Sequence, residues 1–96
     1  MFIVLINYKA ALSEVDRLVP AHRKFLEEHY AAGHFVLSGR KEPRTGGIII
    51  ANAASRAVLD QIIQCDPFYQ AGVADYECIE FIPGMASPEL AGLIPI

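Results

Sequence analysis

Two short stretches of this chain are apolar at every position, and they restrict the fold more than any other feature. Residues 2–6 read Phe-Ile-Val-Leu-Ile and residues 48–50 read Ile-Ile-Ile. Both are rich in β-branched side chains and too short for helices, which indicates strands. A strand with one wet face alternates apolar and polar side chains. Because neither stretch alternates, both faces of these strands must be covered.

The predicted elements follow one another in the order strand, helix, strand, strand, helix, strand. Strands are expected over residues 2–8, 35–39, 47–51 and 75–82, and a Gly- and Pro-containing loop over 42–47 separates the second from the third. This βαββαβ order predicts an α+β, ferredoxin-like domain with a four-stranded antiparallel sheet. Two helices would cover one sheet face. A second copy of the chain is the expected cover for the other, which predicts a homodimer.

The first helix is predicted to begin at Pro20, where the missing N–H of proline costs nothing, and to end near Ala32 before Gly33. Residues 13–18 are predicted to form a separate helical turn. Apolar and aromatic side chains at a spacing of three and four define the inner face of the helix. That face comprises His22, Phe25, Leu26, His29 and Tyr30.

The second helix is predicted to start after an N-cap at Ser55 and to run to about Cys65. Asp66 and Pro67 end it, because a residue before proline avoids the α region. Its expected inner face comprises Val58, Leu59, Ile62 and Ile63. The last segment, residues 83–96, is predicted to be an apolar tail at the dimer interface, with a helical turn near residues 87–90.

Size and charge restrict the class of protein. The chain has 96 residues, which predicts one domain over residues 1–96 with a core that needs no disulfide or metal. Eight basic and eleven acidic residues give a net charge of −3. Nucleic-acid binding is not expected, because the basic residues form no concentrated positive face. The apolar run at residues 2–6 is too short to cross a membrane, so no membrane partner is expected.

The two cysteines and three histidines predict neither a disulfide nor a metal site. Cys65 and Cys78 have the spacing of neither a zinc pair nor a redox motif. We expect both side chains to be reduced and buried, as in a cytoplasmic protein. His22 and His29 lie two helical turns apart, about 10 Å along the axis, which is too far to share a metal directly. His34 is expected at the surface. No metal and no organic cofactor are predicted.

His22 and Asp66 are the candidate catalytic pair. A histidine and an aspartate that the fold brings together form the simplest acid–base pair near neutral pH. The alternative for His22 is a core histidine satisfied by a backbone carbonyl, and the alternative for Asp66 is a helix terminator. Three further residues are candidates for substrate binding. They are Ser38 at a strand end, Arg44 in the glycine-containing loop, and Phe68 after Pro67.

Several of these stretches together resemble the YciI-like (YCII-related) family of the dimeric α+β barrel superfamily. The resemblance rests on His22 in Pro-Ala-His-x-x-Phe-Leu, on Leu-Ser-Gly at 37–39, on Pro-Arg-Thr-Gly-Gly at 43–47, and on Asp-Pro-Phe at 66–68 with Ala-Gly at 71–72. It covers nearly the whole chain. It implies a ferredoxin-like protomer that pairs sheet to sheet as a dimeric α+β barrel. Arg40 departs from it, since many relatives have proline there.

The resemblance also implies a catalytic His–Asp pair, carried here by His22 and Asp66, and small aromatic or lactone-like substrates without a cofactor. The expected function is therefore acid–base chemistry by a small enzyme: isomerisation, lyase chemistry or a dehalogenase-type elimination. Two alternatives stay open. One is a non-catalytic dimer that binds a small ligand or serves regulation, and the other is a subunit of a larger assembly.

Overall fold

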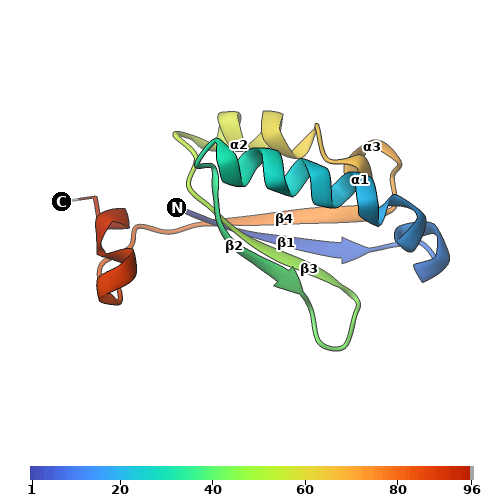
Figure 1. The fold of residues 1–96 in the computed structure, drawn as a ribbon, viewed down its shortest axis with the longest axis horizontal. Coiled ribbons are helices and arrows are strands. Elements are labelled where there is room, and N and C mark those ends of the chain that lie inside the picture. Colours follow the sequence, from blue (N-terminus) through green and yellow to red (C-terminus); the bar gives the residue numbers. More distant parts are fainter. Residues whose placement is uncertain (96) are drawn as a thin grey trace.

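A four-stranded antiparallel sheet carries helices on one of its faces in the computed structural model, which describes residues 1–95 (Figure 1). The strands are β1 (Phe2–Tyr8), β2 (Phe35–Arg40), β3 (Gly46–Ala51) and β4 (Ala74–Glu80), and their order across the sheet is β2-β3-β1-β4. The two strands that contain the apolar stretches, β1 and β3, are thus central. The predicted α+β, ferredoxin-like fold is confirmed.

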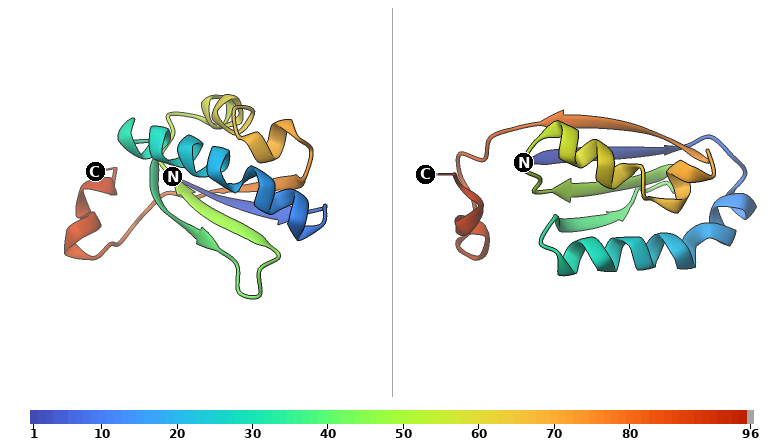
Figure 2. Two further views of the ribbon diagram at one scale, coloured as in Figure 1. Left: turned by 45° about the vertical axis from the view of Figure 1, so that its right-hand side comes forward. Right: turned by 90° about the horizontal axis from the view of Figure 1, so that it is seen from above.

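The strand register separates the apolar positions onto two faces. Val4 lies opposite Ile49 and Cys78, whereas Ile3 lies opposite Ile50 and Ile79. Val4 and Ile49 are buried in the core beneath the helices. The interleaved positions of β1 and β3 lie on the other face, which no helix of the described chain covers (Figure 2). The absence of alternation therefore reflects two apolar sheet faces, only one of which is covered within a single chain.

Helix α1 runs from Leu12–Ala31 without a break, so the prediction of a separate turn and a start at Pro20 was wrong. A proline inside a helix costs about 3 kcal/mol, because it removes one hydrogen bond and crowds the preceding turn. Val15 in the first turns is fully buried. Burying such a side chain contributes about 1.5–3 kcal/mol, and Leu18 and Val19 also pack on the core. Packing offsets the proline, and the first turns bend from the main axis (Figure 2).

Helix α2 spans Arg56–Ile63, and the Ser55 side chain accepts a hydrogen bond from the Val58 amide at 3.2 Å, which confirms the N-cap. Leu59 and its partners at the inner positions are buried, but Val58 is exposed, contrary to prediction. The three buried side chains already fill the face toward the core. Cys65 lies beyond this face and is exposed, and Cys78 is half-buried, so the prediction that both cysteines are buried was wrong. Both cysteines are free.

A short helix that the sequence reading missed, α3 (Pro67–Gln70), follows directly. Helix α2 ends at Ile63, before the predicted end near Cys65, so Asp66 and Pro67 do not end it directly. They are instead the N-cap and the first residue of α3. The helical turn expected near residues 87–90 is present as the 3-10 helix η1 (Pro88–Leu93), which lies apart from the helical layer (Figure 1). None of the helices within residues 1–95 combines the length and apolar character needed to cross a bilayer.

Gly46 sets how closely the β2–β3 hairpin approaches β1. A Cβ atom at this position would lie 1.8 Å from the backbone oxygen of Ile6, which no side chain can accommodate. Glycine therefore permits the contact between the strands. The loop just before it carries Arg44, so this contact also fixes the base of the segment that presents a candidate site residue.

Candidate active site

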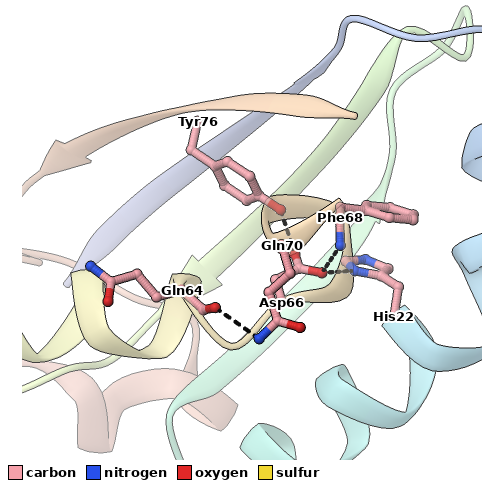
Figure 3. Close-up of polar contacts among 6 residues, drawn as sticks. All are labelled: His22, Gln64, Asp66, Phe68, Gln70 and Tyr76. Atoms are coloured by element: carbon pink, nitrogen blue, oxygen red, sulfur yellow. Dashed lines mark hydrogen bonds and ion pairs between the residues drawn. The ribbon is translucent and has the colours of Figure 1, made fainter. Parts of the chain in front are cut away.

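Asp66 is a completely buried carboxylate that accepts three hydrogen bonds (Figure 3). Its Oδ1 accepts from the Phe68 amide at 3.0 Å and lies 2.7 Å from His22 Nδ1, while its Oδ2 accepts from the Tyr76 hydroxyl at 2.6 Å. The three partners come from α3, α1 and β4. A buried charge is tolerated only when it is paired and hydrogen-bonded, and these donors supply that compensation.

The Asp66 carboxylate fixes which ring nitrogen of His22 carries the proton. An ionised carboxylate only accepts hydrogen bonds, so the short contact requires a proton on Nδ1 of the imidazole. In the neutral ring the other nitrogen, Nε2, then carries the lone pair. The His22 side chain is 13% exposed, and it lines a cavity. The ring is therefore arranged as a base whose accepting nitrogen is Nε2.

Phe68 holds the imidazole from one side. Its ring stacks on that of His22 with centroids 4.0 Å apart and an angle of 8° between the planes. Phe68 is buried, and its backbone amide is one of the donors to Asp66. The short helix α3 thus supplies both a ring that packs on His22 and an amide that positions its carboxylate partner.

The cavity beside His22 has a volume of about 460 Å³ and lies between α1 and the β2–β3 half of the sheet. Ser38, Arg44 and Phe68, the predicted substrate-binding residues, all line it. Asp66 does not line it, because it lies behind His22. Ser38 Oγ accepts a hydrogen bond from Tyr30 at 2.6 Å. The Arg44 guanidinium pairs with Asp16 near the start of α1.

Tyr76 is a site residue that sequence reasoning missed. Burial and the neighbouring Asp66 carboxylate raise the pKa of its phenol far above the usual range, so the hydroxyl remains a donor. Tyr76 shares the helix-facing parity of β4 with Ala74 and Cys78. The alternation along β4 could have shown that Tyr76 faces the helices. It does not show which buried acceptor the hydroxyl contacts. Arg23 and Arg40 also line the cavity and had no assigned role.

The other two histidines lie outside the cavity and contact each other. His29 Nδ1 and His34 Nδ1 are 3.0 Å apart, and His34 is half-buried rather than on the surface as expected. Burial and His34 lower the pKa of His29, against an opposing contribution from Glu28. Within residues 1–95, no three side chains of His, Cys, Asp or Glu gather as metal ligands would.

Comparison with known proteins bears on the fold and on the family. A family model of the YCII-related domain matches residues 1–82. The solved structure of 5-chloro-2-hydroxyhydroquinone dehydrochlorinase (TftG) from Burkholderia phenoliruptrix AC1100, in complex with 2,5-dihydroxybenzoquinone, is similar. The two chains share 20% sequence identity with a TM-score of 0.73, over 88% of this chain and 96% of the other. No curated protein sequence matches the chain.

Replacing Tyr76 by Phe should change how stability depends on alkaline pH. Below about pH 10 a tyrosine is neutral in both folded and unfolded chains. Because the folded-state pKa of Tyr76 is raised, only the unfolded chain ionises as the pH increases further, and the free energy of unfolding falls. At pH 7, Tyr76→Phe should cost about 1–3 kcal/mol by leaving Asp66 without one donor. This difference from wild type should shrink above pH 10.

Urea unfolding at pH 7 to 11.5 measures the effect. Tyr69→Phe is the matched control, because the Tyr69 side chain is exposed, and its curve should run parallel to that of wild type. A difference between Tyr76→Phe and wild type that stays constant across this range would contradict the prediction.

Proposed function

The chain belongs to the YCII-related domain family, and we propose that it is a cofactor-independent enzyme that moves a proton on a small organic substrate. His22 is the proposed general base and acid, and Asp66 orients it and stabilises the protonated ring. The observation that carries the proposal is the buried carboxylate hydrogen-bonded to the imidazole of a cavity-lining histidine. A positioned acid–base group of this kind contributes roughly 10²–10⁴-fold to a rate.

The proposed step begins with neutral His22. Nε2 takes a proton from a substrate carbon next to a carbonyl group, and the bonding electrons move into the carbonyl to form an enolate. Asp66 stabilises the imidazolium, which then has N–H groups on both nitrogens. Return of the proton to a different atom completes an isomerisation. Departure of an anionic leaving group from the enolate, with the proton released to water, completes an elimination.

The proposed substrate is a small ring compound with an acidic C–H or O–H group. The cavity of about 460 Å³ suits a ligand of this size. Ser38 and Arg44 are proposed to bind its polar groups, and Phe68 to pack against its body. Support also comes from the similar fold, which in the dehydrochlorinase complex holds 2,5-dihydroxybenzoquinone. A lactone-like ring fits the same requirements.

The test is proton exchange catalysed in heavy water. A panel of hydroxylated quinones, cyclic diketones and lactones is incubated with the protein, and proton NMR follows loss of the exchangeable C–H signals. Wild type should accelerate exchange of at least one compound, and His22→Gln should slow that exchange roughly 10²–10⁴-fold. The matched control is His34→Gln, which changes a histidine outside the cavity and should retain the wild-type rate.

Binding separates the enzyme from a non-catalytic ligand-binding module. If the protein binds members of the panel but His22→Gln exchanges their protons as fast as wild type does, the catalytic role of His22 is wrong and the binding module is favoured. Circular dichroism and melting temperature confirm that the variants are folded.

We also propose that two chains pair through the uncovered sheet face to form a dimeric α+β barrel. Six apolar side chains occupy this face, on all four strands: Ile3, Leu5, Leu37, Ile48, Ile50 and Ile79. Leu37 is 67% exposed and Ile79 is 50% exposed. A second copy presents the same apolar face, so a twofold interface would cover both at once. The predicted tail is described as far as residue 95, and Ile96 lies outside the described residues. Its exposed Met85 lines a groove together with Leu37 and Ile50 of this face, and we propose that the tail extends the contact.

A charge placed on this face should separate the two chains. Leu37→Glu is chosen because the exposed side chain contributes little to the fold of one chain. It should raise the dimer dissociation constant by roughly 100-fold or more, since the charge would be buried unpaired in the interface. Val58→Glu, at an exposed position on α2, is the control and should remain dimeric.

Analytical ultracentrifugation over a concentration series measures both constants. A wild-type chain that sediments as a monomer throughout would refute the proposed dimer. So would equal dissociation constants for wild type and Leu37→Glu.

A cytoplasmic location is proposed as well, supported by two free cysteines.

A further inference from the structure

The cavity beside His22 has a charge composition opposite to that of the chain. The whole sequence carries eleven acidic and eight basic residues. Three of the basic residues, Arg23, Arg40 and Arg44, line the cavity, and within the described chain no aspartate or glutamate does. We propose that the ligand of this cavity is an organic anion and that Arg23 and Arg40 bind its charged group. The inference concerns the substrate of the proposed enzyme, but it does not depend on proton transfer.

The three arginines differ in how far their charge is already compensated. Arg44 forms an ion pair with Asp16. Arg23 and Arg40 form neither an ion pair nor a side-chain hydrogen bond with any residue of the described chain. Both are exposed enough to meet a ligand from solvent. Their donors are therefore available, whereas those of Arg44 are partly used.

Arg23 and Arg40 belong to elements on different sides of the cavity. Arg23 follows His22 on α1, and Arg40 is the last residue of β2. A guanidinium presents a planar fork of donors that matches a carboxylate or an enolate oxygen, so two of them can bind one anionic group. The cavity walls exclude part of the solvent, which strengthens this attraction relative to a flat surface.

The rest of the lining sets the body of the ligand. Its apolar side chains on the helix side of the sheet include Ile6, Val19, Leu26, Ile49 and Phe68. Inorganic phosphate would leave this surface without a contact, whereas a ring with a carboxylate would use both kinds of wall. Ser38 accepts its hydrogen bond from Tyr30, so its own hydroxyl proton is left to donate. The chemistry of the site thus selects a small organic acid with an apolar ring.

Anion binding would also assist the proposed reaction. Removal of a proton next to a carbonyl group places negative charge on an oxygen, and fixed cations nearby stabilise that charge as it develops. Arg23 and Arg40 would then be specificity-determining residues that also favour the enolate.

Benzoate and benzamide are the probes, because they share one ring and one shape but differ in charge. Isothermal titration calorimetry at about 20 mM salt should give a dissociation constant for benzoate at least tenfold below that for benzamide. Arg23→Gln and Arg40→Gln should each raise the benzoate constant about fivefold or more. Lys24→Gln makes the same charge change on the next residue of α1, outside the cavity lining, and should change it less than about twofold.

The inference would be overturned by equal dissociation constants for benzoate and benzamide, or by no benzoate binding up to about 20 mM. It would also be overturned if Lys24→Gln weakened benzoate binding as much as Arg23→Gln does. The readout is binding without turnover, so it fails separately from the proposed catalysis. Benzoate binding through the two arginines in a protein that exchanges no proton would refute the catalysis and support the anion site. Proton exchange by a protein that binds benzoate no more tightly than benzamide would support the catalysis and refute the anion site.

Discussion

The Asp66 carboxylate is the interaction on which the local structure of this protein depends. A bare charge in this buried position would cost several kcal/mol, and the cost is offset only because three donors converge on two oxygens. Those donors belong to α1, α3 and β4, so the requirement of one carboxylate ties three separate elements together. The same requirement places a proton on His22 Nδ1. Folding and the state of the candidate base are thereby linked.

This linkage explains how a histidine on an apolar helix face can serve chemistry instead of filling space. Asp66 holds the imidazole from behind and Phe68 stacks on it, so its rotation is restricted. The cavity lies on the remaining side, with arginines and apolar side chains in its walls. A base with a fixed tautomer beside a cavity of one-ring size is an arrangement suited to proton transfer, and the surrounding cations suit an anionic partner.

Sequence patterns predicted the fold well because the deciding signals were local. The apolar strands and the Ser55 cap each rest on neighbouring residues. The errors came where tertiary packing outweighed a local preference: Val15 packs into the core and carries α1 past Pro20. The proximity of His22 and Asp66 was expected from their place in the fold. Tyr76 was not found, because parity on a strand shows that a side chain is buried but not which acceptor it meets.

The central claim is that Asp66 is ionised and fixes His22 with its proton on Nδ1 and the lone pair on Nε2. Long-range nitrogen–proton correlation NMR of protein labelled with nitrogen-15 in its histidine rings tests this directly, because protonated and bare ring nitrogens have well separated shifts. At a pH where His22 is neutral, we expect Nδ1 to be protonated and Nε2 to be bare. A proton on Nε2 in the neutral ring, with Nδ1 bare, would contradict the account.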